Sequence, residues 1–142
     1  MPKVFTSKTQ KVGEVGENIA VRFLVKRGFV ILDRNYTKKW GELDIVVEKQ
    51  GKIYFIEVKS VIRDLPAQAG TLNLVSHKTN NTFRPEENMH PRKLQRMARA
   101  IQTYLLSRKN VQEKKWQVDL LIVYLDLNNK KAKIKVVENI IL

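Results

Sequence analysis

The sequence predicts an α/β fold in which helices flank a mixed β-sheet, with elements in the order α-β-β-β-α-β-β. Three observations predict this fold. Residues 41–60 alternate in hydropathy as a β-hairpin does, residues 91–107 carry the apolar stripe of a helix, and residues 116–125 form a nearly continuous apolar run. Because strands that are apolar on both faces occur in covered sheets, we expect helices on both sides of this sheet.

The length predicts a single domain spanning residues 1–142, since a chain of this size can bury one hydrophobic core. No apolar run approaches the roughly 18 residues of a membrane span. The opening sequence, MPKVFTSKTQK, lacks the apolar core of a signal peptide. We therefore expect a cytoplasmic protein that does not partner with a membrane.

The composition is strongly basic, with 27 Lys and Arg against 14 acidic residues and a net charge of +13. This excess favours a polyanionic partner, such as nucleic acid or an anionic membrane surface, over a merely soluble basic protein. The absence of Cys excludes disulfides and thiolate metal sites, and two His residues leave little scope for zinc. Any metal must therefore be bound mainly by oxygen atoms.

The first helix is predicted from about Val12 to Lys26, with Gly28 as its C-terminal stop. Glu17 lies at the edge of its apolar face. Taken alone, an acidic residue in that position is usually a boundary residue. The small residues Gly13 and Gly16 would let the helix approach the sheet closely and bring Glu17 toward other acids.

A first strand is predicted at 29–35, antiparallel to the strand that begins at Gly41, with residues 36–40 as the connection. Trp40 in this connection has two possible roles. It could stack on a nucleic-acid base, or it could pack in the core, which is the more common role of an aromatic side chain.

The hairpin at 41–60 turns near Gln50-Gly51. With either a two-residue or a four-residue loop, each residue pairs with the one whose number adds to its own to give 101. Asp44 then faces Glu57, and Lys59 shares their side of the sheet. A three-residue loop would break this arrangement. Loop parity therefore predicts that two carboxylates and one ammonium group converge.

Buried charges of this kind cost several kcal/mol unless partners or a metal compensate them. From the hairpin alone, a structural Asp/Glu/Lys salt bridge is as good an explanation as a catalytic site. Glu42, which faces Lys59 in the same register, offers a second structural role for that lysine. Asp119 in the apolar strand 116–125 raises the same question, and we expect its partner to be a lysine or the site itself.

The segment at about 61–90 is interrupted by Pro, Gly and Asn and predicts a long mobile loop. The helix that follows, 91–107, carries a second, basic stripe beside its core face. A charge run is usually a solvated face, but four cations with no acid between positions 92 and 108 favour phosphate contact. The predicted nucleic-acid-binding residues are Arg92, Lys93, Arg96 and Arg99. A last, edge-like strand alternates apolar residues with lysines at 132–136.

Residues 41–44 (GELD), the spacing of thirteen to Glu57 and the tripeptide Glu57-Val58-Lys59 resemble the PD-(D/E)XK restriction-endonuclease-like superfamily, and most closely its bacterial YraN family. The resemblance extends through most of the chain. It includes Gly16-Glu17 followed by Ala20, Gly28, Asn35, Lys93 and Val118-Asp119. This chain departs from the family at Val61, where an arginine is usual, and at Gln117-Val118, where Arg-Phe is usual, so no role is carried over for those arginines.

The resemblance implies a restriction-endonuclease-like core and a Mg²⁺ or Mn²⁺ site. Asp44, Glu57 and the Val58 carbonyl would hold the metal, with Glu17 acting through water. Lys59 would position or deprotonate the attacking water and stabilise negative charge at phosphorus. The expected function is a metal-dependent nuclease acting on DNA, with branched or repair intermediates as candidate substrates.

A second hypothesis is a non-catalytic nucleic-acid-binding module on the same fold, in which the acid cluster is residual or structural. Clustered carboxylates repel phosphate and would weaken such a module, so their presence favours the nuclease. A homodimer is compatible with either function, and the sequence does not decide it.

Overall fold

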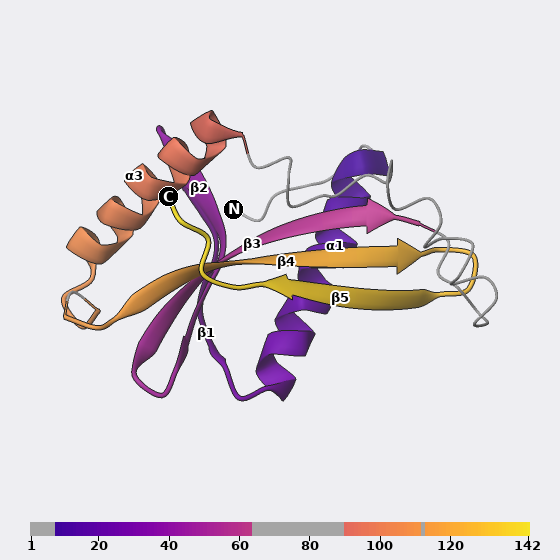
Figure 1. Cartoon of the computed structure of the whole chain (residues 1–142), viewed down its shortest axis with the longest axis horizontal. Coiled ribbons are helices and arrows are strands. Elements are labelled where there is room, and N and C mark those ends of the chain that lie inside the picture. The colour runs from indigo at the N-terminus through magenta and orange to yellow at the C-terminus, as the bar shows by residue number, and fades with distance from the viewer. Residues whose placement is uncertain (1–7, 64–89, 112) are drawn as a thin grey trace.

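The computed structural model describes residues 8–63, 90–111 and 113–142 (Figure 1). Its elements follow the predicted order α-β-β-β-α-β-β. They are α1 (Lys8–Lys26), β1 (Val30–Lys38), β2 (Gly41–Lys49), β3 (Lys52–Ile62), α3 (Pro91–Ser107), β4 (Trp116–Asp126) and β5 (Lys131–Val137). Nearly all of the long loop expected at about 61–90 lies outside the described residues. Within the described part of the chain, no helix is long and apolar enough to cross a membrane.

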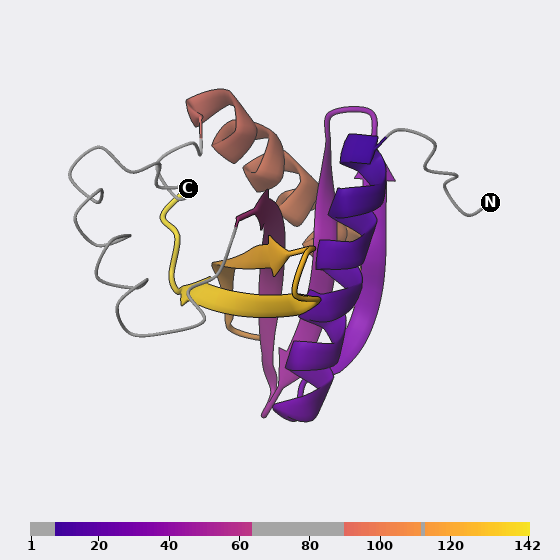
Figure 2. The same cartoon turned by 90° about the vertical axis from the view of Figure 1, so that its right-hand side faces the viewer.

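The five strands form one sheet in the order β1-β2-β3-β4-β5. The central pair, β3 and β4, is parallel, and the other neighbouring pairs are antiparallel. The predicted mixed sheet is therefore confirmed. α1 and α3 lie on opposite sides of it, as Figure 2 shows.

Each helix packs on its own apolar cluster, which accounts for strands with two apolar faces. The cluster beneath α3 includes Phe55, Met97, Ile101 and Tyr104. The cluster beneath α1 includes Ala20, Leu24, Ile45, Val47, Ile56 and Leu121. Successive side chains of a strand point to opposite faces, so β2, β3 and β4 supply both clusters.

The predicted first strand was too short. β1 continues to Lys38, so the connection to β2 is only Lys39-Trp40. Tyr36 pairs with Leu43 and packs on the cluster beneath α3, which holds this part of the chain in the sheet. Two other elements also extend beyond their predicted ends. α1 begins at Lys8, and β3 continues to Ile62 because β4 pairs with it along its whole length.

The β2–β3 hairpin has the predicted register. Lys49 pairs with Lys52 across a two-residue loop, and the ladder ends at Ile45 opposite Ile56. Gln50 and Gly51 both have positive φ, 51° and 77°, as the favoured two-residue hairpin turns require. Asp44 and Glu57 are consequently the first residues beyond the paired part of the hairpin.

Candidate active site

The carboxyl groups of Asp44 and Glu57 meet where β2 separates from β3. Asp44 Oδ2 accepts a hydrogen bond of 2.8 Å from the backbone N–H of Val58. The two carboxyl groups are close enough for protonated Glu57 to donate a hydrogen bond to the Asp44 carboxylate. The Asp44 side chain thus takes the place of a backbone acceptor for the Val58 N–H. The two-residue loop of the hairpin has brought the two acids together, as predicted.

Burial makes it costly for both acids to be ionised. Glu57 is 5% exposed. Burial, followed by the charge of Asp44, raises the pKa of Glu57 to about 8. Burial also raises the pKa of Asp44. Two neighbouring carboxylates disfavour each other's ionisation, so the charge of Asp44 adds to burial in raising the pKa of Glu57.

The cation that contacts Glu57 comes from α3. Lys93 Nζ forms an ion pair with Glu57 Oε1, and the lysine side chain is about half exposed. Burial opposes the charge of Lys93, but the carboxylates of Glu57, Asp44 and Glu42 outweigh burial and raise the pKa of the lysine. Lys93 had been predicted only to bind phosphate. Its contact with Glu57 depends on how α3 docks against the sheet, which the strand pattern cannot reveal.

Lys59 lies two residues beyond Glu57 on β3, where it pairs in register with Ile122 of β4. Strand parity places it on the same side of the sheet as Glu57. Its side chain is partly buried. The position is therefore compatible with the predicted role of Lys59 beside the two acids.

Glu17 approaches the acid pair from α1. Burial and the charge of Asp44 raise its pKa, so the two carboxyl groups lie within electrostatic reach of each other. Arg34 of β1 holds Glu17 through an ion pair of 3.2 Å, and the same guanidinium donates to Asn18 Oδ1 at 2.8 Å. Sequence reasoning missed Arg34. A cation within a short strand next to the Asp44 strand was the signal that could have found it.

Close contact between α1 and the sheet brings Glu17 into position. A Cβ atom added to Gly16 would lie 1.8 Å from Ser60 Oγ, so a side chain at this position would collide with β3. The expected role of Gly16 is confirmed. The same role expected for Gly13 was wrong, because a Cβ there would have no described atom within 4 Å.

A cavity of about 440 Å³ opens on the α3 side of the acid pair. It has Glu57 in its wall and cations of the α3 N-terminal half around it. Its lining residues are Glu42, Glu57, His90, Arg92, Lys93, Arg96 and Met97. An anionic group that enters this cavity therefore meets Arg92, Lys93 and Arg96 close to the carboxyl of Glu57.

The donor atoms suit a hard cation such as Mg²⁺, which prefers oxygen ligands and keeps several waters. The carboxyl groups of Asp44 and Glu57 carry two negative charges once their protons are released, enough to balance a divalent ion. Glu17 stands further back, paired with Arg34. Among residues 8–63, 90–111 and 113–142, no three Asp, Glu, His or Cys side chains come close enough to hold one metal by themselves.

Trp40 lies against α3 and is 40% exposed, so the core position favoured for it was wrong. Its indole Nε1 donates to Thr103 Oγ1 at 3.1 Å, and its carbonyl accepts from Arg96 Nε at 3.2 Å. The short β1–β2 turn brings the indole to the helix surface. Arg92 and Arg99 are also exposed on α3, so Trp40 shares its surroundings with the predicted basic stripe.

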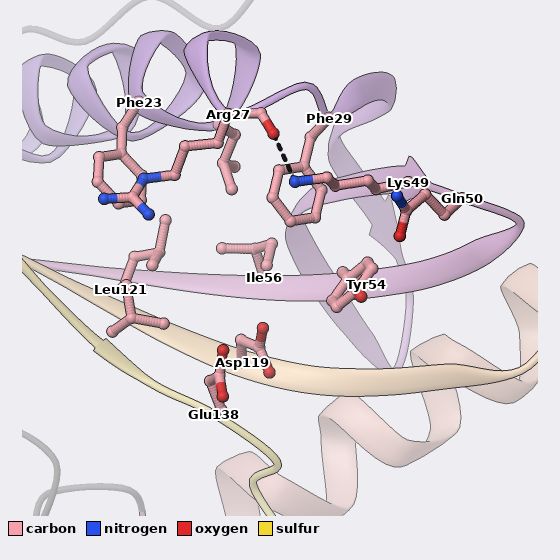
Figure 3. Close-up of a pocket in the computed structure, with 12 residues that line it drawn as sticks. Phe23, Arg27, Phe29, Lys49, Gln50, Tyr54, Ile56, Asp119, Leu121 and Glu138 are labelled. Carbon is pink, nitrogen blue, oxygen red and sulfur yellow. Dashed lines mark hydrogen bonds between the residues drawn. The ribbon is translucent and has the colours of Figure 1, made fainter.

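Asp119 belongs to a different part of the molecule. Its Oδ1 accepts from Gln117 Nε2 at 2.7 Å and from the backbone N–H of Asn139 at 3.1 Å. In the part of the chain that the structure describes, neither a lysine nor the acid pair is its partner, so that expectation was wrong. Asp119 lines a second cavity of about 440 Å³ on the α1 side of the sheet, across from Phe23 and Phe29 (Figure 3). Neutral donors satisfy this carboxylate.

The chain is similar to proteins of one family. The model of Uncharacterised protein family UPF0102 matches residues 16–123. A UPF0102 protein of Alkaliphilus oremlandii (strain OhILAs) is 31% identical over 131 residues, which cover 92% of this chain and 97% of the relative. A UPF0102 protein of Campylobacter jejuni subsp. jejuni is 33% identical over 115 residues, covering 81% and 85%.

One solved structure, Pyrococcus furiosus SfsA in complex with Ca²⁺, aligns with 98% of this chain and 74% of that chain. The identity is 16% and the TM-score is 0.37. A likeness at this level carries no argument about the activity of the chain.

Proposed function

The chain belongs to the uncharacterised protein family UPF0102, which confirms its resemblance to the YraN family, and we propose that it is a metal-dependent nuclease that hydrolyses phosphodiester bonds in DNA. One observation carries the proposal. Buried Glu57 contacts the partly buried carboxyl of Asp44 and lines a cavity whose rim carries Arg92, Lys93 and Arg96. Oxygen ligands beside a phosphate-binding surface are what metal-assisted hydrolysis of a phosphodiester requires.

Each predicted site residue has a role in this proposal. Asp44 and Glu57 would hold Mg²⁺ or Mn²⁺, with the Val58 carbonyl as a further ligand and Glu17 acting through water. A metal held there would supply Lewis-acid chemistry, polarising the phosphate and lowering the pKa of a water molecule. Lys59 orients or deprotonates that water and stabilises negative charge at phosphorus. Binding of the DNA backbone falls to the exposed cations of α3, which are Arg92, Lys93, Arg96 and Arg99.

A second candidate function is a non-catalytic nucleic-acid-binding module. It is favoured by the ion pair between Lys93 and Glu57, which already compensates one buried carboxyl with a protein cation. The same candidate gains support from the lack of a three-acid group among the described residues. In such a module the acid pair would fix the position of α3 on the sheet, and the arginines would bind phosphate without chemistry.

Cleavage assays with the wild type and Lys59→Ala separate these functions. End-labelled single-stranded, duplex, flapped and four-way-junction DNA, and RNA, would each be incubated in Mg²⁺, Mn²⁺ or EDTA. We expect the wild type to cleave DNA only with metal, and Lys59→Ala to bind equally well but cleave slower by orders of magnitude. Glu14→Gln, which changes an exposed acid of α1, is the matched control and should cleave normally.

Two outcomes would overturn the nuclease. Cleavage that persists in EDTA, or equally in the Lys59→Ala preparation, would reveal a contaminating enzyme. Binding of every substrate without cleavage of any would favour the second candidate.

A further inference from the structure

We propose that Trp40 and the basic stripe of α3 form a binding surface for an unpaired nucleotide, whose base stacks on the exposed indole while its neighbouring phosphates contact Arg96 and Arg99. The inference rests on the proposed function, because it names the form of the nucleic acid that the candidate site accepts. The main observation behind it is the position of Trp40, which plays no part in forming the acid pair.

Two hydrogen bonds fix Trp40 on α3. The indole Nε1 donates to Thr103 Oγ1 at 3.1 Å, and the carbonyl accepts from Arg96 Nε at 3.2 Å. Arg96 and Thr103 are seven residues apart, two helical turns on one face of α3. The ring is therefore held along the same stripe that carries the predicted phosphate contacts.

The close approach of the β1–β2 turn to α3 has a specific cause at the next residue. A Cβ atom added to Gly41 would lie 2.6 Å from the backbone oxygen of Arg96. Any larger residue would push the turn away from the helix. Glycine at this position therefore brings Trp40 into contact with α3, where the indole is oriented before any ligand arrives.

The exposed part of Trp40 is suited to stacking. The indole N–H already has a protein acceptor, so the apolar ring is what the residue presents to solvent. It is 40% exposed, although a large aromatic ring gains stability from burial. Aromatic rings next to cations are the common elements of surfaces that bind single-stranded nucleic acids without sequence preference.

The charge around the ring fits a phosphate backbone. Arg92, Arg96 and Arg99 are exposed on α3, and Lys38 and Lys39 are exposed at the adjoining turn. α3 itself contains no acidic residue. A nucleic-acid strand with a base stacked on Trp40 thus has cations on both sides of that base.

The geometry also favours unpaired over paired nucleotides. In a duplex the flat faces of the bases are covered by their neighbours, so an aromatic ring gains access only to a base that has left the stack. Arg96 contacts Trp40 and also lines the cavity that contains Glu57. A strand held at Trp40 can therefore continue along α3 toward the acid pair, which places the candidate site close to an unpaired segment.

The chain offers a matched control for this proposal. It has two tryptophans, Trp40 and Trp116, which are 40% and 42% exposed. Trp116 begins β4, and its ring packs edge-on against Phe55 with the ring centroids 5.6 Å apart, a different partner from Thr103 and Arg96, which hold Trp40. Binding of fluorescein-labelled oligo(dT) and of a blunt duplex would be measured by anisotropy in EDTA, where no metal-dependent cleavage occurs.

We expect Trp40→Ala to weaken oligo(dT) binding about tenfold and duplex binding less than about twofold, since one stacked base is lost. Trp40→Phe should keep most of the affinity, and Trp116→Ala should change neither. In a Trp116→Phe background, oligo(dT) should quench the remaining Trp40 fluorescence. Thr103→Val, which removes the indole acceptor, should weaken oligo(dT) binding by a smaller factor.

Thermal unfolding of each variant would show that the fold is retained. If Trp40→Ala does not fold, the single variants Trp40→Phe and Thr103→Val provide the test. Equal losses for oligo(dT) and duplex, equal effects of the two tryptophans, or unquenched Trp40 fluorescence would overturn the inference. These results would overturn the binding surface but would not contradict cleavage by the wild type. Conversely, quenching at Trp40 without cleavage of any substrate would overturn the nuclease and support the surface.

Discussion

Glu57 on β3 and Asp119 on β4 are both buried acids of largely apolar strands, yet they have different surroundings. Each lies in a largely apolar strand, the strands are neighbours, and each residue is 5% exposed. Asp119 accepts hydrogen bonds from two neutral donors, the Gln117 amide and the Asn139 backbone. Glu57 instead faces a second carboxyl group and an ammonium group.

The difference teaches that burial of an acid does not by itself indicate a functional site. A buried carboxylate with neutral donors is already satisfied and has little to gain from a ligand. A buried carboxyl against another carboxyl keeps a charge imbalance that a proton or a cation must correct. The type of partner, more than the degree of burial, distinguishes the candidate site from a structural acid.

The largest expected effect concerns catalysis. Asp44→Asn and Glu57→Gln should each slow DNA cleavage by about 10²–10³-fold, in line with the loss of one group that stabilises transition-state charge. Both should also weaken Mn²⁺ binding in a calorimetric titration, because an anionic ligand is lost. Asp119→Asn should leave both quantities within about threefold in the same assays. Equal effects at Asp119 and Glu57 would remove the distinction between the two acids.

The next effect concerns stability, for which Asp119 should matter more than Glu57. Asp119→Ala should destabilise the protein by about 2–3 kcal/mol, because the Asn139 N–H and the Gln117 amide lose their buried acceptor. Asp119→Asn, which keeps an acceptor oxygen, should cost less. Urea unfolding at pH 7 measures both free energies. A loss from Glu57→Gln as large as that from Asp119→Ala would indicate that Glu57 is equally structural.

The pH dependence of stability should come from the acid pair. Glu57 has its pKa raised from 4.5 to about 8 in the folded protein, so the folded state binds the proton more tightly than the unfolded state. This contribution is complete below pH 4.5 and is lost as the pH rises toward 8. Asp44 and Glu17, whose pKa values burial also raises, act in the same direction.

Without metal, unfolding free energy should therefore fall by about 1–3 kcal/mol between pH 5 and pH 8.5. Urea titrations in EDTA across this range would measure it, and the fall should be shallower in Glu57→Gln. Added Mn²⁺ should restore stability at the upper end of the range. A stability that rises with pH would contradict the arrangement described for the acid pair.

The smallest expected effect compares single arginines on the two sides of the sheet. Arg99 on α3 and Arg22 on α1 are both exposed. Arg99→Ala should weaken DNA binding about fivefold at 0.15 M salt and lower the log-log salt slope by about 0.9, the effect of one lost phosphate contact. Arg22→Ala should change neither. If Arg22 proves as sensitive as Arg99, phosphate binding is spread over both helices.

The sequence was sufficient for features that local rules determine. Strand alternation and the Gln50-Gly51 turn fixed the register, and the register brought Asp44 to Glu57. The apolar stripe and the proline at its start predicted α3 with its observed bounds. In these cases the determining residues lie within a few positions of one another.

Features that depend on docking between distant segments could not be predicted. The Lys93–Glu57 ion pair joins residues on either side of a long intervening segment. Asp119 finds its backbone donor at Asn139, beyond the end of the last strand. Trp40 was expected in the core because aromatic rings usually pack there, but the extension of β1 leaves a two-residue turn and carries it to the surface of α3. Hydropathy patterns contain no information on these contacts.

The hydrogen bond from the Val58 N–H to Asp44 has a practical consequence. Because this backbone group donates to a titratable side chain, its proton resonance should move when Asp44 gains or loses charge or binds a cation. An ¹⁵N-labelled sample would thus report the occupancy of the acid pair at a single amide signal. The neighbouring strand amides, bonded to carbonyls that do not titrate, provide an internal reference in the same spectrum.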